Sequence, residues 1–301
     1  MKKVLPLFAA CAILSGCFGP GSEEYQESLK DHSSYHCQNQ TFNPNSVRDT
    51  AEVEKVYCDI QDFPNEDLSQ LSQFSDLTSL YLDGRQTMEQ QSIIFNSSWT
   101  PKLKTLNLNN INFETIDLSQ LEQINRLSLN NVNMPNLDLT NLETLKHFIL
   151  NKTNLTSLDL SYNAALEDVL IKETKIKLFD FSGNTKLIEL SLVWNSETNS
   201  SIELTNQPAL KRLSILNQEI KNLYVNLPNL ESANFNNNKL TSVDFSGSPE
   251  LSTLLLWDNL LTDINVDANK KLSNLNLTGN PLTEEAKSYL KTLTWIDNIE
   301  Y

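Results

Sequence analysis

The chain has 301 residues, with 23 basic and 38 acidic side chains and a formal net charge of −15. This balance argues against a nucleic-acid-binding protein, because phosphate contacts need clustered lysine and arginine. Hydrophobic residues make up 39% and charged residues 20%, which excludes a globally disordered chain, and the 50 leucines and 37 asparagines indicate a repeated structural unit.

The first segment has the order of an export signal. Two lysines precede an apolar stretch, residues 4–13, that is too short to span a bilayer. The stretch ends in Leu14-Ser15-Gly16-Cys17, which closely resembles the lipobox of bacterial lipoproteins. That resemblance implies a signal peptide over residues 1–16, cut before Cys17, whose thiol then carries acyl chains such as palmitate. An ordinary signal peptide with a chance cysteine is the alternative. Polar residues 17–35 predict a flexible tether.

Two further cysteines lie in the next segment, residues 36–76, which we expect to form an N-terminal cap. Export to an oxidising compartment favours a disulfide bond between Cys37 and Cys58. The alternative is a metal site that combines Cys37 with His32 and His36. Structural zinc usually takes four ligands, and this stretch offers three. We therefore predict a disulfide bond, with no metal site and no cofactor.

Residues 77–282 contain a repeated pattern, Leu-x-x-Leu-x-Leu-x-x-Asn-x-Leu. Most successive copies are 21 residues apart, within the range of leucine-rich repeats, and a degenerate copy begins at Val53. The copies begin at Leu77, Leu103, Ile124, Leu145, Leu166, Leu187, Leu210, Leu230, Leu251 and Leu272. The second half of the unit, as in Leu155-Thr156-Ser157-Leu158-Asp159-Leu160, resembles that of the J-type internalins, bacterial surface proteins. The resemblance implies an α/β-type repeat solenoid with a parallel β-sheet on its concave face.

Each position of the unit has a physical reason. Positions 4 and 6 alternate with polar neighbours and predict a short strand with one buried face, and stacking of such strands creates a shared core. Leu158, in the second half, is also expected in the core. The internalin-type repeats often have a cysteine ladder at position 6, where this chain has one cysteine, Cys58. Position 9 is expected to bond the backbone of neighbouring units through Asn195, Gln218, Asn238, Asn259 and Asn280.

The last segment, residues 283–301, predicts a helical C-terminal cap. Thr283 precedes two glutamates, which is a typical helix start, and we expect a helix through about Leu293. Ala286, Leu290 and Leu293 would then share one face and close the open core.

Nothing in the sequence has the spacing of a catalytic centre, so we do not expect an enzyme. An acidic residue recurs in one column, at Asp117, Asp138, Asp159, Asp180, Glu203 and Asp244. A row of calcium ligands is one interpretation. The interpretation that we prefer is that each carboxylate bonds a local backbone group or a nearby Ser or Thr.

The concave sheet face is the predicted binding surface. Most of its outward positions are small and polar, but a strip of large residues interrupts them. The predicted ligand-binding residues are Ile149, Leu170, Val193, Trp194, Arg212, Leu216, Leu255 and Trp257. An error in the register, or coverage by the longer unit at 187–210, would remove the strip from solvent. A different surface, a sugar ligand, or no specific role are the alternatives to protein binding.

These observations predict a monomeric, membrane-anchored, extracytoplasmic lipoprotein that binds a protein ligand on its concave face, as a surface adhesion or host-interaction module. A periplasm-facing scaffold or inhibitor is the alternative. In Gram-negative lipoproteins an aspartate directly after the lipidated cysteine usually retains the protein in the inner membrane. This chain has Phe18 there, so by that resemblance the outer membrane is favoured if the host is Gram-negative.

Overall fold

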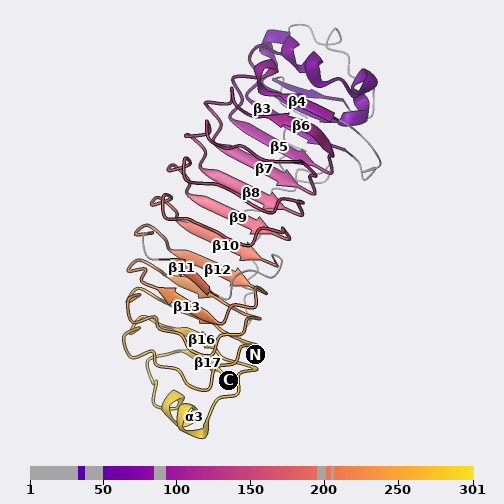
Figure 1. Ribbon diagram of the computed structural model, residues 1–301. Coiled ribbons are helices and arrows are strands. Elements are labelled where there is room, and N and C mark those ends of the chain that lie inside the picture. The colour runs from indigo at the N-terminus through magenta and orange to yellow at the C-terminus, as the bar shows by residue number, and fades with distance from the viewer. Residues whose placement is uncertain (1–32, 38–49, 85–92, 195–200, 205–206) are drawn as a thin grey trace.

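A computed structural model describes residues 33–37, 50–84, 93–194, 201–204 and 207–301. The predicted signal peptide, Cys17 and most of the predicted tether lie outside these residues. The described units stack along one axis into an elongated solenoid, with a 3₁₀-helical region at one end and a short α-helix at the other (Figure 1). The predicted leucine-rich-repeat solenoid is therefore confirmed.

One strand from each unit joins a parallel sheet of 13 strands that runs the length of the molecule. Its strands in order are β1 (Ser34–His36), β2 (Lys55–Asp59), β3 (Ser79–Asp83), β5 (Thr105–Asn109), β7 (Arg126–Asn130), β8 (His147–Asn151), β9 (Asp168–Lys172), β10 (Glu189–Val193), β12 (Arg212–Leu216), β14 (Ser232–Asn234), β15 (Thr253–Leu255), β16 (Asn274–Asn276) and β17 (Asn298–Glu300). Successive strands pair with the same positions of the unit side by side, as Thr105 with Arg126 and Arg126 with His147. The strand covers positions 3 to 7 of the unit from β2 to β12 and positions 3 to 5 in β14, β15 and β16.

The core lies on one side of this sheet, as the alternation predicts. Leu106 and Leu108, at positions 4 and 6 of one unit, have no exposed surface, and the same holds for Phe148 and Leu150 in the unit two further on. Each strand contacts mainly the strands before and after it, so no unit buries its apolar side alone. Stacking of the units creates the core.

The second half of each unit lines the other side of the core. In four of the described units this second half contains a strand, and these strands form two small parallel sheets. One pairs β4 (Ile93–Asn96) with β6 (Phe113–Asp117), and the other pairs β11 (Ser201–Leu204) with β13 (Asn222–Val225). The expectation for Leu158 was wrong in degree, because Leu158 is only partly buried whereas Leu155 and Leu160 are buried. All three leucines pack in or against the core, and Leu158 lies at its margin.

The expected asparagine column at position 9 is present. The Asn259 side chain donates to the carbonyls of Phe235, Leu256 and Trp257, and its oxygen accepts from the N–H of Leu240. Asn238 and Asn280 repeat this pattern, while Gln218 donates to the carbonyl of Leu216 within its own unit. Asn195, also expected here, lies outside the described residues. In these later units the column fixes the bend after the strand by satisfying buried backbone groups.

A second amide column was not predicted. Asn163, Asn184 and Asn269 are buried in the second half of their units and donate to backbone carbonyls of the preceding unit. Gln207 does the same toward Phe181. The recurring Asn after Leu-Ser-Tyr and Phe-Ser-Gly was the available signal in the sequence. Each amide joins two successive units on the side opposite the main sheet.

The two ends have different covers. At the first end lie the short 3₁₀ helices η2 (Thr50–Glu52), η3 (Ile60–Asp62), η4 (Pro64–Glu66) and η5 (Leu68–Gln73), and η6 (Ser97–Trp99) follows in the unit that begins at Leu77. Residues 34 and 35, placed in the tether by the sequence, belong to β1. At the far end α3 (Glu284–Leu290) starts at Thr283, whose side chain accepts from the N–H of Ala286. The helix stops before Leu293, which is nevertheless buried, and the unpredicted strand β17 follows.

Among the described residues, no helix has the length and apolar character needed to cross a membrane.

Candidate binding surface on the concave sheet

The structure brings four predicted ligand-binding residues together on the solvent side of the main sheet. Ile149, Leu170 and Val193 form a hydrophobic cluster separate from the core, and Leu216 packs against it. Ile149 pairs with Leu170 across β8 and β9, and Val193 pairs with Leu216 across β10 and β12. Leu170 faces Ser191, so its contact with Val193 is diagonal. We call these four residues the apolar cluster.

The apolar cluster is less exposed than the sequence suggested. Ile149, Leu170 and Val193 retain 4%, 8% and 9% of their surface, and they pack against one another. Leu216 is half-buried and extends the cluster toward the later strands. A partner would therefore meet a narrow apolar strip rather than four protruding side chains.

Trp194 follows the cluster and protrudes from it. Its side chain is 56% exposed, and its backbone has a φ of 49°, in the left-handed region. Position 8 of nearly every unit adopts this conformation, so that the chain turns after the strand. The N–H at position 8 still donates to the next unit, as Trp194 does to the carbonyl of Leu216. The residues in this column are Asn110, Asn131, Lys152, Glu173, Trp194, Asn217, Asn237, Asp258 and Gly279.

Residue type in this column distinguishes the middle of the solenoid. Asparagine, aspartate and glycine tolerate positive φ, whereas for other L-residues this conformation costs about 1–2 kcal/mol. Lys152, Glu173 and Trp194 are the exceptions, and they occupy three successive units beside the apolar cluster. A bulky side chain such as that of Trp194 is unfavourable in this backbone conformation.

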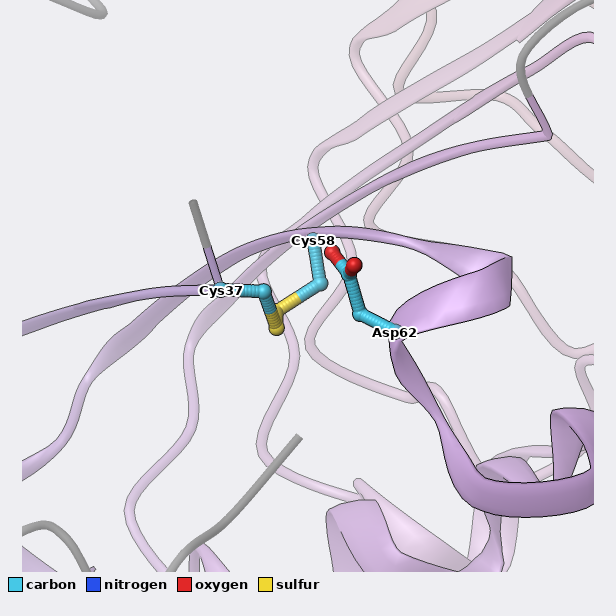
Figure 2. A group of neighbouring side chains, drawn as sticks. All are labelled: Cys37, Cys58 and Asp62. Carbon is cyan, nitrogen blue, oxygen red and sulfur yellow. A yellow bond between two sulfur atoms is a disulfide. The ribbon is translucent and has the colours of Figure 1, made fainter. Parts of the chain in front are cut away.

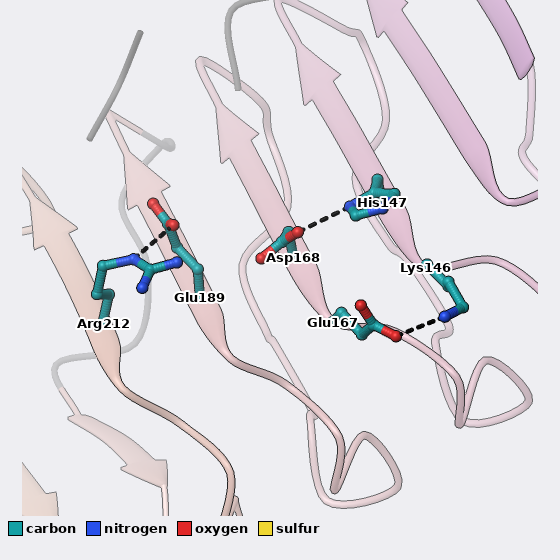
Figure 3. Close-up of polar contacts among 6 residues, drawn as sticks. All are labelled: Lys146, His147, Glu167, Asp168, Glu189 and Arg212. Carbon is teal, nitrogen blue, oxygen red and sulfur yellow. Dashed lines mark hydrogen bonds and ion pairs between the residues drawn. The ribbon is translucent and has the colours of Figure 1, made fainter. Parts of the chain in front are cut away.

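Charged residues border the cluster on the side where the strands begin. His147 Nδ1 lies 2.7 Å from Asp168 Oδ2, and Arg212 Nε donates to Glu189 Oε2 at 2.8 Å (Figure 3). Just before these strands Lys146 pairs with Glu167 at 2.8 Å. Arg212, one of the predicted ligand-binding residues, thus lies on this border, and its guanidinium already has a carboxylate partner.

The opposite border, where the strands end, was not predicted. Glu173 lies 3.1 Å from the Lys172 ammonium and 3.7 Å from the Lys152 ammonium, so two cations share one carboxylate. The Lys172 ammonium also lies 5.7 Å from the centre of the Trp194 ring, a cation–π contact. The interruption of the Asn column by Lys, Glu and Trp was the signal in the sequence that could have found this border.

Leu255 and Trp257, the remaining predicted residues, lie on the same face but apart from the cluster. Both are half-buried, and β14 separates their unit from Leu216. The Trp257 N–H donates to the Asn236 side chain. The predicted ligand-binding residues therefore fall into two groups, the apolar cluster with its neighbours and the separate pair Leu255 and Trp257.

A stack of aromatic rings occupies the first end of the same face. The His36 and Tyr57 rings lie 4.6 Å apart and the Tyr57 and Tyr81 rings 4.4 Å apart, nearly parallel in both cases. Their faces are turned toward one another along the solenoid axis, so the stack fixes the first strands to each other rather than offering ring faces to a ligand.

The acidic column follows the interpretation that we preferred. Asp117, Asp138, Asp159, Asp180 and Asp244 each accept a hydrogen bond from the backbone N–H two residues later. Hydrogen bonds from Thr140, Ser161 and Ser182 lower the pKa of Asp138, Asp159 and Asp180. Bonds from the Ser246 backbone and side chain lower the pKa of Asp244. The side chain of Glu203 lies outside the described part. These carboxylates therefore hold turns in place.

The predicted disulfide bond joins Cys37 and Cys58, whose Cα atoms are 5.0 Å apart (Figure 2). Asp62 lies beside it, and the three residues form a buried group of metal-ligand type. Both sulfurs are used in the bond, and the Asp62 carboxylate accepts from the N–H of Asp59 at 3.0 Å. The group is thus a structural crosslink with a capped turn beside it.

Neither a family model nor a curated protein matches the sequence. Solved structures do match the fold. The functional domain of InlJ from Listeria monocytogenes, which includes a cysteine ladder, aligns with a TM-score of 0.66 at 20% identity and covers 82% of this chain. This chain spans 58% of that domain. The leucine-rich-repeat protein LIC12759 of Leptospira interrogans aligns with a TM-score of 0.61 at 20% identity, over 87% of this chain and 81% of its own.

A third match comes from an octameric complex of Latrophilin 3, Unc5D and FLRT2, in which FLRT2 contributes the leucine-rich repeats. It aligns with a TM-score of 0.50 at 18% identity, over 83% of this chain and 74% of the matched chain. Identities at this level establish the fold and leave the ligand open. The protein is a leucine-rich-repeat solenoid with units of about 21 residues, similar in architecture to the internalin InlJ.

Proposed function

We propose that this protein is a non-enzymatic binding module that recognises a protein ligand on its concave face, at the apolar cluster and Trp194. The observation that carries the proposal is a separate hydrophobic cluster on a solvent-facing sheet whose other positions are largely Asn, Ser and Thr. An exposed tryptophan and a half-exposed arginine border it, and these residue types dominate binding energy at protein interfaces. The occurrence of leucine-rich repeats in the FLRT2 complex is consistent with such a role.

We also propose that the module is held at a membrane by acyl chains on Cys17 and faces the outside of the cell as an adhesion or host-interaction protein. The support is the Leu14-Ser15-Gly16-Cys17 run behind a basic and apolar start, together with the disulfide bond, which suits an oxidising compartment. Two or more acyl chains hold a protein stably to a bilayer.

Selection of peptide ligands tests the binding surface directly. A displayed library of random 16-residue peptides is selected on the wild-type protein, and the Kd of each enriched peptide is measured against variants. Leu170→Asn/Leu216→Asn places asparagine at two positions of the strand face where other units already have it. We expect at least tenfold weaker binding, about 1.4 kcal/mol, because the central apolar contact is lost.

The matched control is Leu178→Asn/Leu260→Asn, which removes two leucines that are 67% and 49% exposed and lie outside the main sheet. This pair should leave the Kd unchanged. Urea unfolding of both double variants verifies that they fold. Peptides that bind the Leu170→Asn/Leu216→Asn variant as tightly as the wild type would contradict the proposed surface.

A further inference from the structure

We infer that the ligand of this surface carries a carboxylate next to its apolar anchor, and that the carboxylate is bound by Lys152 and Lys172 beside Trp194. The inference rests on the proposed function and adds the chemical class of the partner, a segment with neighbouring apolar and acidic side chains. Two independent observations carry it, the uneven charge on the two borders of the apolar cluster and the backbone conformation of Trp194.

The two borders of the apolar cluster differ in their balance of charges. Where the strands begin, at position 3 of successive units, Arg126 and Arg212 balance Asp168 and Glu189, and the acids are paired within the protein. Where the strands end, Lys152 and Lys172 have one carboxylate, Glu173, between them. Among the residues of this border that the structure describes, which end at Trp194 in its unit, one positive charge is therefore left without a matching acid.

That excess is unusual in a chain with a net charge of −15. The two ammonium groups remain accessible, since the side chains of Lys152 and Lys172 are 54% and 37% exposed while that of Glu173 is 26% exposed. Lys175 and Lys177 follow in the same unit and are also exposed, so they add to the positive potential. An incoming carboxylate would complete the charge balance of this border.

The register places the cation next to the apolar contact. Lys172 pairs with Val193 across β9 and β10, and Val193 pairs with Leu216 across the next strand. An apolar side chain seated on Val193 and Leu216 therefore lies beside the strand that carries Lys172, about one strand spacing or roughly 5 Å away. Neighbouring side chains of one peptide segment can reach both places. The apolar floor favours such a segment over a bare anion.

Trp194 is the second observation. Its φ of 49° places a large side chain where most other units have asparagine, aspartate or glycine, and its exposed ring lies over the Lys172 ammonium. A residue kept for folding would stabilise the protein. A residue that serves binding and holds an unfavourable backbone conformation would lower the free energy of unfolding. Its replacement by a residue suited to this conformation would therefore raise that free energy.

The first test uses charge reversal. Peptides enriched on the wild type, from the library described above, should contain Asp or Glu within two residues of Leu, Ile, Phe or Trp. Lys152→Glu/Lys172→Glu should weaken these peptides at least tenfold, and peptide versions with Lys in place of the acid should recover affinity for that variant. The matched control, Lys102→Glu/Lys271→Glu, reverses two exposed lysines outside the surface that also have acidic partners.

The second test separates binding from folding at Trp194. Trp194→Asn should raise the urea midpoint of unfolding and weaken the enriched peptides at least fivefold. A lower urea midpoint together with unchanged affinity would assign Trp194 a structural role and overturn this part of the inference.

The outcomes distinguish the inference from the proposed function. Peptides that depend on Leu170 and Leu216 but tolerate the lysine reversal would refute the acidic partner and leave the surface intact. Peptides that depend on neither pair, or a selection in which no peptide is enriched, would refute both.

Discussion

Asparagine side chains join successive units at positions where leucine packing leaves backbone groups unpaired. In the position 9 column Asn259 donates to three carbonyls and accepts one backbone N–H, and Asn259 itself is buried. The second column, with Asn163, Asn184 and Asn269, does the same on the other side of the core. A short amide suits these places because it donates and accepts at once and fits inside the bend.

Removal of one such amide should be costly. Asn259→Ala should lower the free energy of unfolding by about 2–3 kcal/mol, because several buried backbone groups lose their partner together. The measurement is urea unfolding followed by circular dichroism. Asn229→Ala is the matched control, since Asn229 is exposed and makes one bond, to the Pro208 carbonyl. Its cost should stay within about 0.5 kcal/mol, and equal costs for the two variants would contradict the role of the column.

At the scale of the element, each strand is held by its two neighbours, and the end strands have only one. β1 pairs with β2 and with no other described strand of the main sheet. The Cys37–Cys58 bond crosslinks these first two units, and the stacked rings of His36, Tyr57 and Tyr81 run along the same edge. The disulfide bond therefore stabilises the end of the array where one neighbour is missing.

Removal of that bond should lower the local stability of the first end of the array more than that of the middle. In Cys37→Ser/Cys58→Ser, amide hydrogen exchange should speed up in β1 and β2 and stay unchanged in β8 and β9, because the stacked units transmit stability only to their neighbours. The crosslink spans a sequence separation of 21 residues, for which loop closure contributes about 3 kcal/mol. Exchange in β1 that is as slow without the bond as with it would contradict this role.

At the scale of the whole molecule, the solenoid is a linear array with one continuous core and two different covers. Its sheet offers an extended face, and the residues that interrupt its polar character gather near the middle, on β8, β9, β10 and β12. A binding site in the middle of the array does not involve the two ends. In the proposed function the chain before β1 serves as the connection to a membrane.

That connection makes a prediction about the complete protein. Cys17→Ser, expressed in a bacterium that processes lipoproteins, should no longer partition into the detergent phase, because no acyl chain can be attached. Mass spectrometry should show the wild type shortened by residues 1–16 and acylated, and the variant without acyl groups. Cys11→Ser, within the predicted signal peptide, is the control and should behave as the wild type. Equal partitioning of wild type and Cys17→Ser would disprove the anchor.

The sequence alone determined the period of the repeat, the inward positions 4 and 6, the Cys37–Cys58 pair and the helix start at Thr283. These features depend on local alternation, spacing and capping chemistry, which are visible in the order of residues. It also identified Ile149, Leu170, Val193 and Leu216 as unusual on their face, because most residues in their columns are small and polar.

Only the tertiary structure decided how these residues meet. Mutual burial of the apolar cluster, the partial exposure of Leu158 and the second amide column all depend on contacts between residues about 21 positions apart. The shared carboxylate of Lys152 and Lys172 and the left-handed backbone of Trp194 depend on how each turn follows its strand. Side-chain pairing across units is a property of the stacked array, and no single unit contains it.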